Sequence, residues 1–158
     1  MKKLILIALV AVLGFGAVRA QDKNADLAII VGKASALDSV TTAELTKILR
    51  AEKAKGADGV KFTLSMREAG SPERAAILSS VYSMNEAEFA KFFLQATFTG
   101  AVQSAPRQIS GAAGAKQFVS GTPGGICYVR GSDADDSVKV VKVDGKLPGE
   151  AGYPLKIK

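Results

Sequence analysis

The sequence predicts an α/β protein, a three-layer sandwich built around a mainly parallel sheet. The continuous apolar run Leu27–Val31 is typical of a strand that is covered on both faces, and the alternating segment Lys61–Met66 indicates a second strand. Helix signals separate these strands from each other and from a further apolar strand, Ile126–Val129. Strands that alternate with helices usually pair in parallel beneath layers of helix.

The first predicted helix follows a loop at 32–40. Thr41 and Glu44 match a capping box, and the apolar residues behind them form one face of a helix that ends near Arg50. The segment 51–59 is rich in lysine, alanine and glycine, which indicates an exposed turn before the second strand.

Two further helices follow the second strand. Ser71 is a good N-cap, and Pro72 stands at the first helical position, where its missing N–H costs nothing. A second capping box, Ser83–Glu86, predicts a helix over Asn85–Thr97. That helix carries an apolar stripe of Phe89, Phe92, Phe93 and Ala96.

The last third of the chain adds one helix and two strands. The segment 101–108 is expected to be a connector, after which Ser110 caps a short helix that reaches about Val119. Ile126–Val129 follows a glycine-rich turn, and Val138–Val143 alternates like a final strand. The tail to Lys158 is expected to lie along the surface.

The first twenty residues have the features of a secretory signal peptide. Two lysines precede the apolar run Leu4–Val18, and a small-x-small pattern ends at Ala20, where we expect cleavage. The alternative is a retained membrane anchor, but the run is shorter than the roughly 20 residues that a spanning helix needs. We therefore expect a signal peptide at 1–20, a single domain at 21–158, a periplasmic location and no membrane span after cleavage.

Composition excludes several classes of function. Loss of three basic residues with the signal lowers the net charge from +6 to +3, which argues against nucleic acid as a partner. The chain has no histidine, so Ser-His and Cys-His catalysis and most zinc sites are excluded. Its one cysteine, Cys127, lies in an apolar strand and cannot form an intrachain disulfide. We expect no cofactor, no metal site and no catalytic residues.

The candidate site is the loop between the strand Lys61–Met66 and the helix that begins at Pro72. A helix that begins at the carboxyl end of a strand presents free backbone N–H groups, which bind anions. Arg67 and Arg74 on either side add positive charge. The alternative is an ordinary strand-to-helix turn with two solvated arginines.

Several segments together resemble the periplasmic phosphate-binding-protein-like family of ABC-transporter substrate-binding proteins. They cover most of Leu27 to Gly145 in the order that the family has them. The segments are Ala28–Val31, Leu45–Leu49 (the family's "L..IF"), Ala57–Gly59 ("W.DG"), Phe92-Phe93 with Phe98–Gly100 ("YW....FTG"), Pro123–Val129 ("PGAIGYV") and Val138–Gly145 ("gVKVL.VDG").

The resemblance implies a type II periplasmic binding protein that binds phosphate or a similar oxyanion. Arg67, Gly70 and Ser71 match the family's "R..GSGT" loop, and Arg74 is a supporting charge. Pro72 stands where the second glycine would be, which removes one backbone donor. Full receptors of this type have two lobes and roughly 250 residues or more, so this chain resembles one lobe.

Three functions remain open from the sequence. The first is an exported oxyanion-binding protein that delivers its ligand to an ABC permease. The second is a single-lobe adaptor of the cell envelope that binds a protein rather than a solute. The third and weakest is an enzyme, because Glu68 and Glu73 show no spacing typical of an acid–base pair. On the first hypothesis, Arg67→Ala abolishes oxyanion binding with little change in thermal stability.

Overall fold

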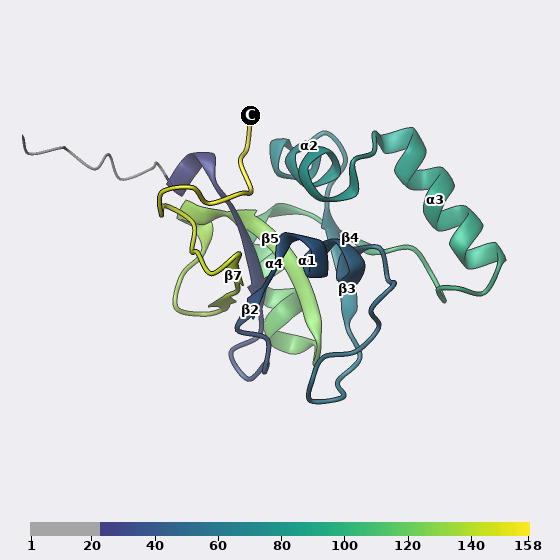
Figure 1. The fold of residues 1–158 in the computed structure, drawn as a ribbon, viewed down its shortest axis with the longest axis horizontal. Helices are drawn as coiled ribbons and strands as arrows, with labels where there is room; N and C mark the ends of the chain where they lie inside the picture. The colour runs from purple at the N-terminus through teal and green to yellow at the C-terminus, as the bar shows by residue number, and fades with distance from the viewer. Residues whose placement is uncertain (1–22) are drawn as a thin grey trace, which may run out of the picture.

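A five-stranded sheet forms the centre of the computed structural model, which describes residues 23–158 (Figure 1). Its order is β4-β3-β5-β1-β6. The strands are β1 (Leu27–Val31), β3 (Thr63–Arg67), β4 (Arg107–Ile109), β5 (Gly125–Arg130) and β6 (Lys139–Val140). β3 is parallel to both β4 and β5, whereas β1 is antiparallel to β5 and β6. Four of the five strands therefore run in one direction, which confirms the α/β class with a mainly parallel sheet. The predicted signal peptide lies outside the described residues.

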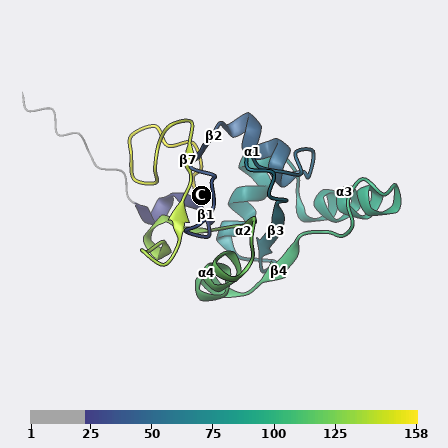
Figure 2. The same cartoon turned by 90° about the horizontal axis from the view of Figure 1, so that it is seen from below.

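Helices cover both faces of the sheet and complete the three layers (Figure 2). One face carries α4 (Gly111–Gly121). The other carries α1 (Thr42–Leu49), α2 (Pro72–Ile77) and η2 (Leu78–Tyr82), a π-helical turn that continues α2. The helix α3 (Glu86–Phe98) extends to one side of the body in both views.

Strand alternation divides the interior into two cores. Every residue of β1 is at most 1% exposed, and its alternate side chains enter opposite cores, Ile29 one and Ile30 the other. The larger core lies under α1, η2 and α3 and includes Met66, Ile77, Tyr82, Phe93 and Tyr128. The smaller core lies under α4 and includes Ala115, Val119, Cys127 and Val129.

Side-chain caps fix where the helices begin. Thr41 accepts a hydrogen bond from the Glu44 N–H, but the Glu44 carboxylate pairs with Lys53 instead of completing the box. The second capping box lies two residues later than predicted, at Asn85 and Glu88. Ser83 cannot be the N-cap because it takes a left-handed conformation with φ of 53° and ends η2.

The predicted strand Val138–Val143 is in fact two. β6 joins the main sheet, and β7 (Lys142–Val143) pairs in parallel with β2 (Ser39–Val40), which the sequence suggested was a loop. Val141 lies between them, fully buried, and donates its N–H to the Ile29 carbonyl. β4 was likewise expected to be a connector, because an edge strand of three largely exposed residues lacks apolar alternation. Two short 3₁₀ turns complete the elements, η1 (Lys23–Ala25) and η3 (Gly131–Asp133).

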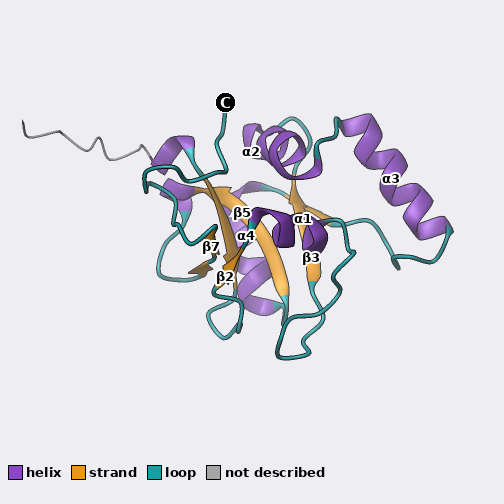
Figure 3. Ribbon diagram, in the orientation of Figure 1, coloured by secondary structure: helices purple, strands orange, loops and turns teal. Residues whose placement is uncertain are grey.

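The segment after β7 contains no further helix or strand and returns to the start of β1 (Figure 3). The Leu27 N–H donates to the Leu155 carbonyl, and the Tyr153 hydroxyl donates to the Leu27 carbonyl at 2.7 Å. Both tail residues are buried, so the expected surface tail is part of the core. Over residues 23–158, no helix is both long and apolar enough to cross a bilayer.

Candidate anion-binding site

Two helices begin at the same edge of the sheet. Because β3 and β4 are parallel and Arg67 is paired with Ile109, their carboxyl ends lie side by side. The loop 68–71 leads from β3 into α2, and Ser110 leads from β4 into α4. In open α/β sheets, ligands bind at such a carboxyl edge, where backbone N–H groups of helix starts are exposed.

Arg67 is the last residue of β3 and is only 6% exposed. Its Nε and Nη2 atoms donate to the two carboxylate oxygens of Glu68, at 3.0 and 3.1 Å. Its Nη1 atom is buried and has no hydrogen-bond partner among residues 23–158. Burial lowers the pKa of Arg67, but the hydrogen bond and charge of Glu68 outweigh this, so the net change is upward. The guanidinium is therefore a fixed cation with one nitrogen, Nη1, that has no hydrogen-bond partner in the described chain.

The Glu68 carboxylate connects the two helix starts. One of its oxygens also accepts from the Gly111 N–H at 3.2 Å, at the first residue of α4. The first N–H groups of a helix have no acceptor within the helix, so Glu68 satisfies one of these donors at the start of α4. The hydrogen bond from Arg67 lowers the pKa of Glu68 to about 2, so the group is ionised at neutral pH.

Gly70 and Ser71 shape the loop. Gly70 has a φ of +84°, which favours glycine, and a Cβ at this position would meet nothing within 4 Å. The Ser71 hydroxyl donates to the Glu68 carbonyl at 2.9 Å and accepts from the Arg74 N–H at 3.2 Å. Ser71 is thus the predicted N-cap, and its hydroxyl proton is used within the loop.

Arg74 joins α2 to β3 and α3. Its guanidinium donates to both carboxylate oxygens of Glu86, at 2.6 and 2.8 Å, and to the Arg67 carbonyl at 2.9 Å. It also lies over the Phe89 ring, 5.2 Å from the centroid. The Glu86 hydrogen bond raises the pKa of Arg74. These contacts give Arg74 a structural role beside the loop.

Replacing Arg74 by methionine is expected to loosen α3. The substitution leaves the Arg67 carbonyl and Glu86 without their donor, and we expect a loss of about 1–3 kcal/mol of unfolding free energy. Hydrogen exchange should show faster exchange along α3 than along β1 or β5. Arg50→Met is the matched control, because Arg50 also lies over a ring, that of Phe92, but makes no bond between elements. Equal protection of α3 in both variants would contradict this role.

The structure brings three of the four predicted residues into one loop. Arg67, Gly70 and Ser71 lie together in this loop. The Arg74 side chain instead contacts Phe89, which belongs to the larger core. The Arg67 charge lies near Cys127, which belongs to the smaller core. Sequence reasoning missed the Glu68 bridge to Gly111. The acidic residue next to Arg67 was visible, but its partner follows 43 residues later.

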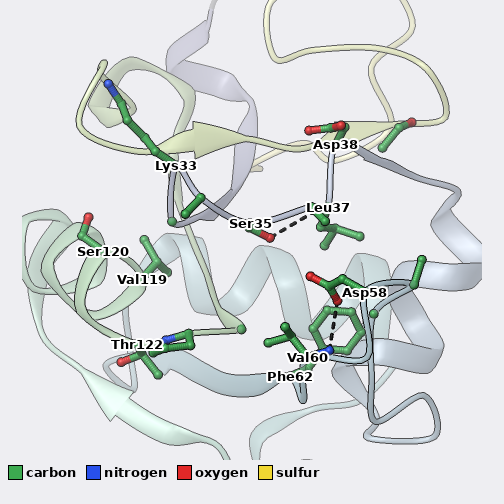
Figure 4. Close-up of a pocket in the computed structure, with 18 of the residues that line it drawn as sticks. Lys33, Ser35, Leu37, Asp38, Asp58, Val60, Phe62, Val119, Ser120 and Thr122 are labelled. Atoms are coloured by element: carbon green, nitrogen blue, oxygen red, sulfur yellow. Dashed lines mark hydrogen bonds between the residues drawn. The ribbon is translucent and has the colours of Figure 1, made fainter.

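A cavity lies at the opposite end of the strands (Figure 4). It has a volume of about 460 Å³ and opens at the carboxyl end of β1 and the amino ends of β3 and β5. Leu37, Val60 and Phe62 supply an apolar lining. Its charged groups include pairs, such as Asp38 with Lys139, and the Asp58 carboxylate accepts from the Val60 N–H. The lysines that line this cavity, Lys33 and Lys53, are not buried, in contrast to Arg67.

Solved structures of phosphate-binding proteins share the fold of this chain. A candidate phosphate ABC transporter substrate-binding protein with bound phosphate, from Clostridium perfringens, is 23% identical with a TM-score of 0.64, covering 78% of this chain and 47% of that one. An ABC-type phosphate transport receptor from Vibrio cholerae is 17% identical with a TM-score of 0.67, covering 84% and 53%. PstS from Borrelia burgdorferi is 17% identical with a TM-score of 0.63, covering 85% and 55%.

These comparisons establish the fold. No model of a known protein family matches the sequence, and no curated protein matches it. The chain spans about half the length of the three solved proteins, with coverage of 47–55%. The sequence resembled one lobe of a two-lobed binding protein. Coverage of about half of each solved protein agrees with this, as does the mainly parallel sheet between two helical layers. The chain has the fold of one lobe of a phosphate-binding-protein-like periplasmic binding protein.

Proposed function

We propose that this chain is an exported binding protein that holds a small tetrahedral oxyanion, phosphate first, at the loop 67–71. The observation that carries the proposal is the Arg67 guanidinium, which is buried, charged and left with an unused donor. A buried cation without full hydrogen bonding is costly, and a bound anion is one arrangement that would complete its hydrogen bonds.

The surrounding chemistry suits an oxyanion. A planar guanidinium donates two parallel hydrogen bonds to a phosphate or carboxylate, which gives both strength and orientation. Gly70 leaves room for close approach to the loop, and the start of α4 supplies a backbone N–H. The Ser71 hydroxyl fixes the shape of the loop, because it donates to the Glu68 carbonyl and accepts from the Arg74 N–H.

A single lobe supplies only half of an enclosed site. Two-lobed binding proteins close around their ligand by a hinge motion, which removes water and adds donors from the second lobe. This chain alone therefore binds weakly, and we propose that an ABC permease or another envelope protein supplies the second surface. Its named neighbours are proteins of phosphate transport, which supports this assignment.

Calorimetric titration of residues 21–158 with sodium phosphate and sodium sulfate tests the proposal. We expect saturable heat with phosphate at micromolar to millimolar concentrations and none with sodium chloride at equal ionic strength. Circular dichroism confirms that the sample is folded. Absence of heat at tens of millimolar phosphate, with folded protein, contradicts oxyanion binding.

A second candidate is a single-lobe adaptor that binds a protein partner. Phe98 is 91% exposed and Leu94 is 73% exposed on the helix that extends from the body. Large apolar side chains gathered on a projecting helix are typical of an interaction surface. A folded protein that is silent toward phosphate and sulfate would leave this candidate as the better one.

A further inference from the structure

The Glu68 carboxylate makes the contacts that an oxyanion would make. It accepts two parallel hydrogen bonds from the Arg67 guanidinium and a third from the Gly111 N–H at the start of α4. A bidentate arginine together with a helix N-terminus is the donor set that binds phosphate and carboxylate ligands in proteins. In the structure, a side chain of the same chain fills that donor set.

The two partners of this ion pair differ in their freedom to move. The Arg67 side chain is 8% exposed, whereas that of Glu68 is 34% exposed. Hydrating the displaced Glu68 carboxylate costs little, because it is already partly exposed, and the incoming oxyanion takes its place beside the buried guanidinium. The backbone of Glu68 stays fixed, because its carbonyl accepts from both the N–H and the hydroxyl of Ser71.

We propose that the Glu68 carboxylate occupies the position of the ligand, and that an oxyanion binds by displacing it from Arg67 and from the start of α4. This inference rests on the proposed function and adds a regulatory contact to the same site. Glu68 is therefore a competitor within the chain, which pairs with the Nε and Nη2 atoms of Arg67 in place of a ligand.

The contact of Glu68 with Arg67 lowers the apparent affinity of the site for an oxyanion, although the hydrogen-bond donors of the site stay the same. A ligand that binds only the open state sees its affinity reduced by the fraction of molecules in which the site is open. If Glu68 leaves the site open about a tenth of the time, the dissociation constant rises about tenfold. Neutralising Glu68 is then expected to tighten oxyanion binding.

Calorimetric titration of wild type and Glu68→Gln with inorganic phosphate tests the displacement. Glutamine keeps the size of the side chain but removes the charge that holds it against Arg67, so we expect phosphate to bind about tenfold more tightly. Glu88→Gln is the control for net charge, because Glu88 lies at the N3 position of α3 and glutamine also serves in a capping box. We expect this control to bind like wild type.

The outcomes separate this inference from the proposed function. Tighter phosphate binding by Glu68→Gln than by wild type, with Glu88→Gln unchanged, supports displacement. Binding by wild type with an equal or weaker constant in Glu68→Gln overturns the displacement and leaves the proposed function standing, with Glu68 then orienting Arg67. No binding by either protein overturns both. If Glu88→Gln gains as much phosphate affinity as Glu68→Gln, the gain is due to net charge and displacement is overturned.

A second measurement needs no substitution at Glu68. In the wild type, NMR of the Glu68 side-chain carboxyl carbon reports whether phosphate changes its surroundings. We expect this signal to move to the position of a solvated glutamate as phosphate saturates, together with a shift of the Gly111 amide. Binding detected by heat with an unmoved Glu68 signal would overturn the displacement.

Discussion

Replacing Arg67 by alanine is expected to abolish phosphate binding and also to reduce the stability of the fold. Binding is lost because the other buried guanidinium of the described chain, that of Arg74, is already bound by Glu86. The sequence predicted that Arg67→Ala would leave the thermal stability nearly unchanged. At 6% exposure its removal leaves an unfilled volume and takes two hydrogen-bond donors from Glu68, so we expect a loss of about 1–2 kcal/mol of unfolding free energy.

Arg67→Lys separates charge from shape. Lysine keeps the positive charge but lacks the planar fork that engages two oxygens at once. We expect it to fold and to bind phosphate at least tenfold more weakly than wild type. Calorimetry measures the binding, and urea unfolding measures the stability. Unchanged phosphate binding in folded Arg67→Ala would place the site elsewhere and reduce the loop to a turn.

Replacing Gly124 by alanine is expected to give the largest loss of stability. Gly124 lies in the turn before β5 with a φ of +71°, and its carbonyl accepts from the Thr63 N–H at the start of β3. A Cβ here would lie 2.1 Å from the Lys61 carbonyl oxygen, a backbone atom that cannot rotate away. β3 and β5 must separate to admit it, and we expect a loss of about 3–4 kcal/mol, the upper range for point substitutions.

Two other glycines supply the controls for Gly124→Ala. Gly59 has a φ of +79° but open space around it, so Gly59→Ala isolates the conformational cost of about 1–2 kcal/mol. Gly121, at the end of α4, has neither a contact nor a positive φ, so alanine there should be neutral or slightly stabilising. Urea unfolding of the three variants checks this order. A loss in Gly124→Ala no larger than in Gly59→Ala would show that the turn relaxes without moving the strands.

Patterns among neighbouring residues correctly predicted those helices and strands that depend on interactions between neighbours in the sequence. The apolar run Leu27–Val31 predicted a strand covered on both faces, and it lies next to the centre of the sheet, buried throughout. Ser71 and Pro72 predicted the start of α2, because a cap and an N1 proline act within one turn. The loop at the carboxyl end of β3 followed from the same reasoning.

These short-range sequence patterns could not predict contacts between segments that are far apart in the sequence. The Glu68 bridge to Gly111 depends on β4 lying beside β3, and β4 is too short and polar to show a period. The burial of Tyr153 depends on the tail meeting β1, which no window of neighbouring residues reveals. Ser83 looked like a cap by composition, but its left-handed conformation is set by the end of η2.

The return of the tail to β1 has a consequence for the timing of folding. β1 is made first, yet its partners β5 and β6 and the Leu155 carbonyl come from the last part of the chain. Pairings between the two ends of a chain give a high contact order, which slows folding. The sheet therefore cannot close until β5 and β6 have left the ribosome or a translocation pore. For a chain that we propose to be exported, this dependence preserves an unfolded, translocation-competent state until transport is complete.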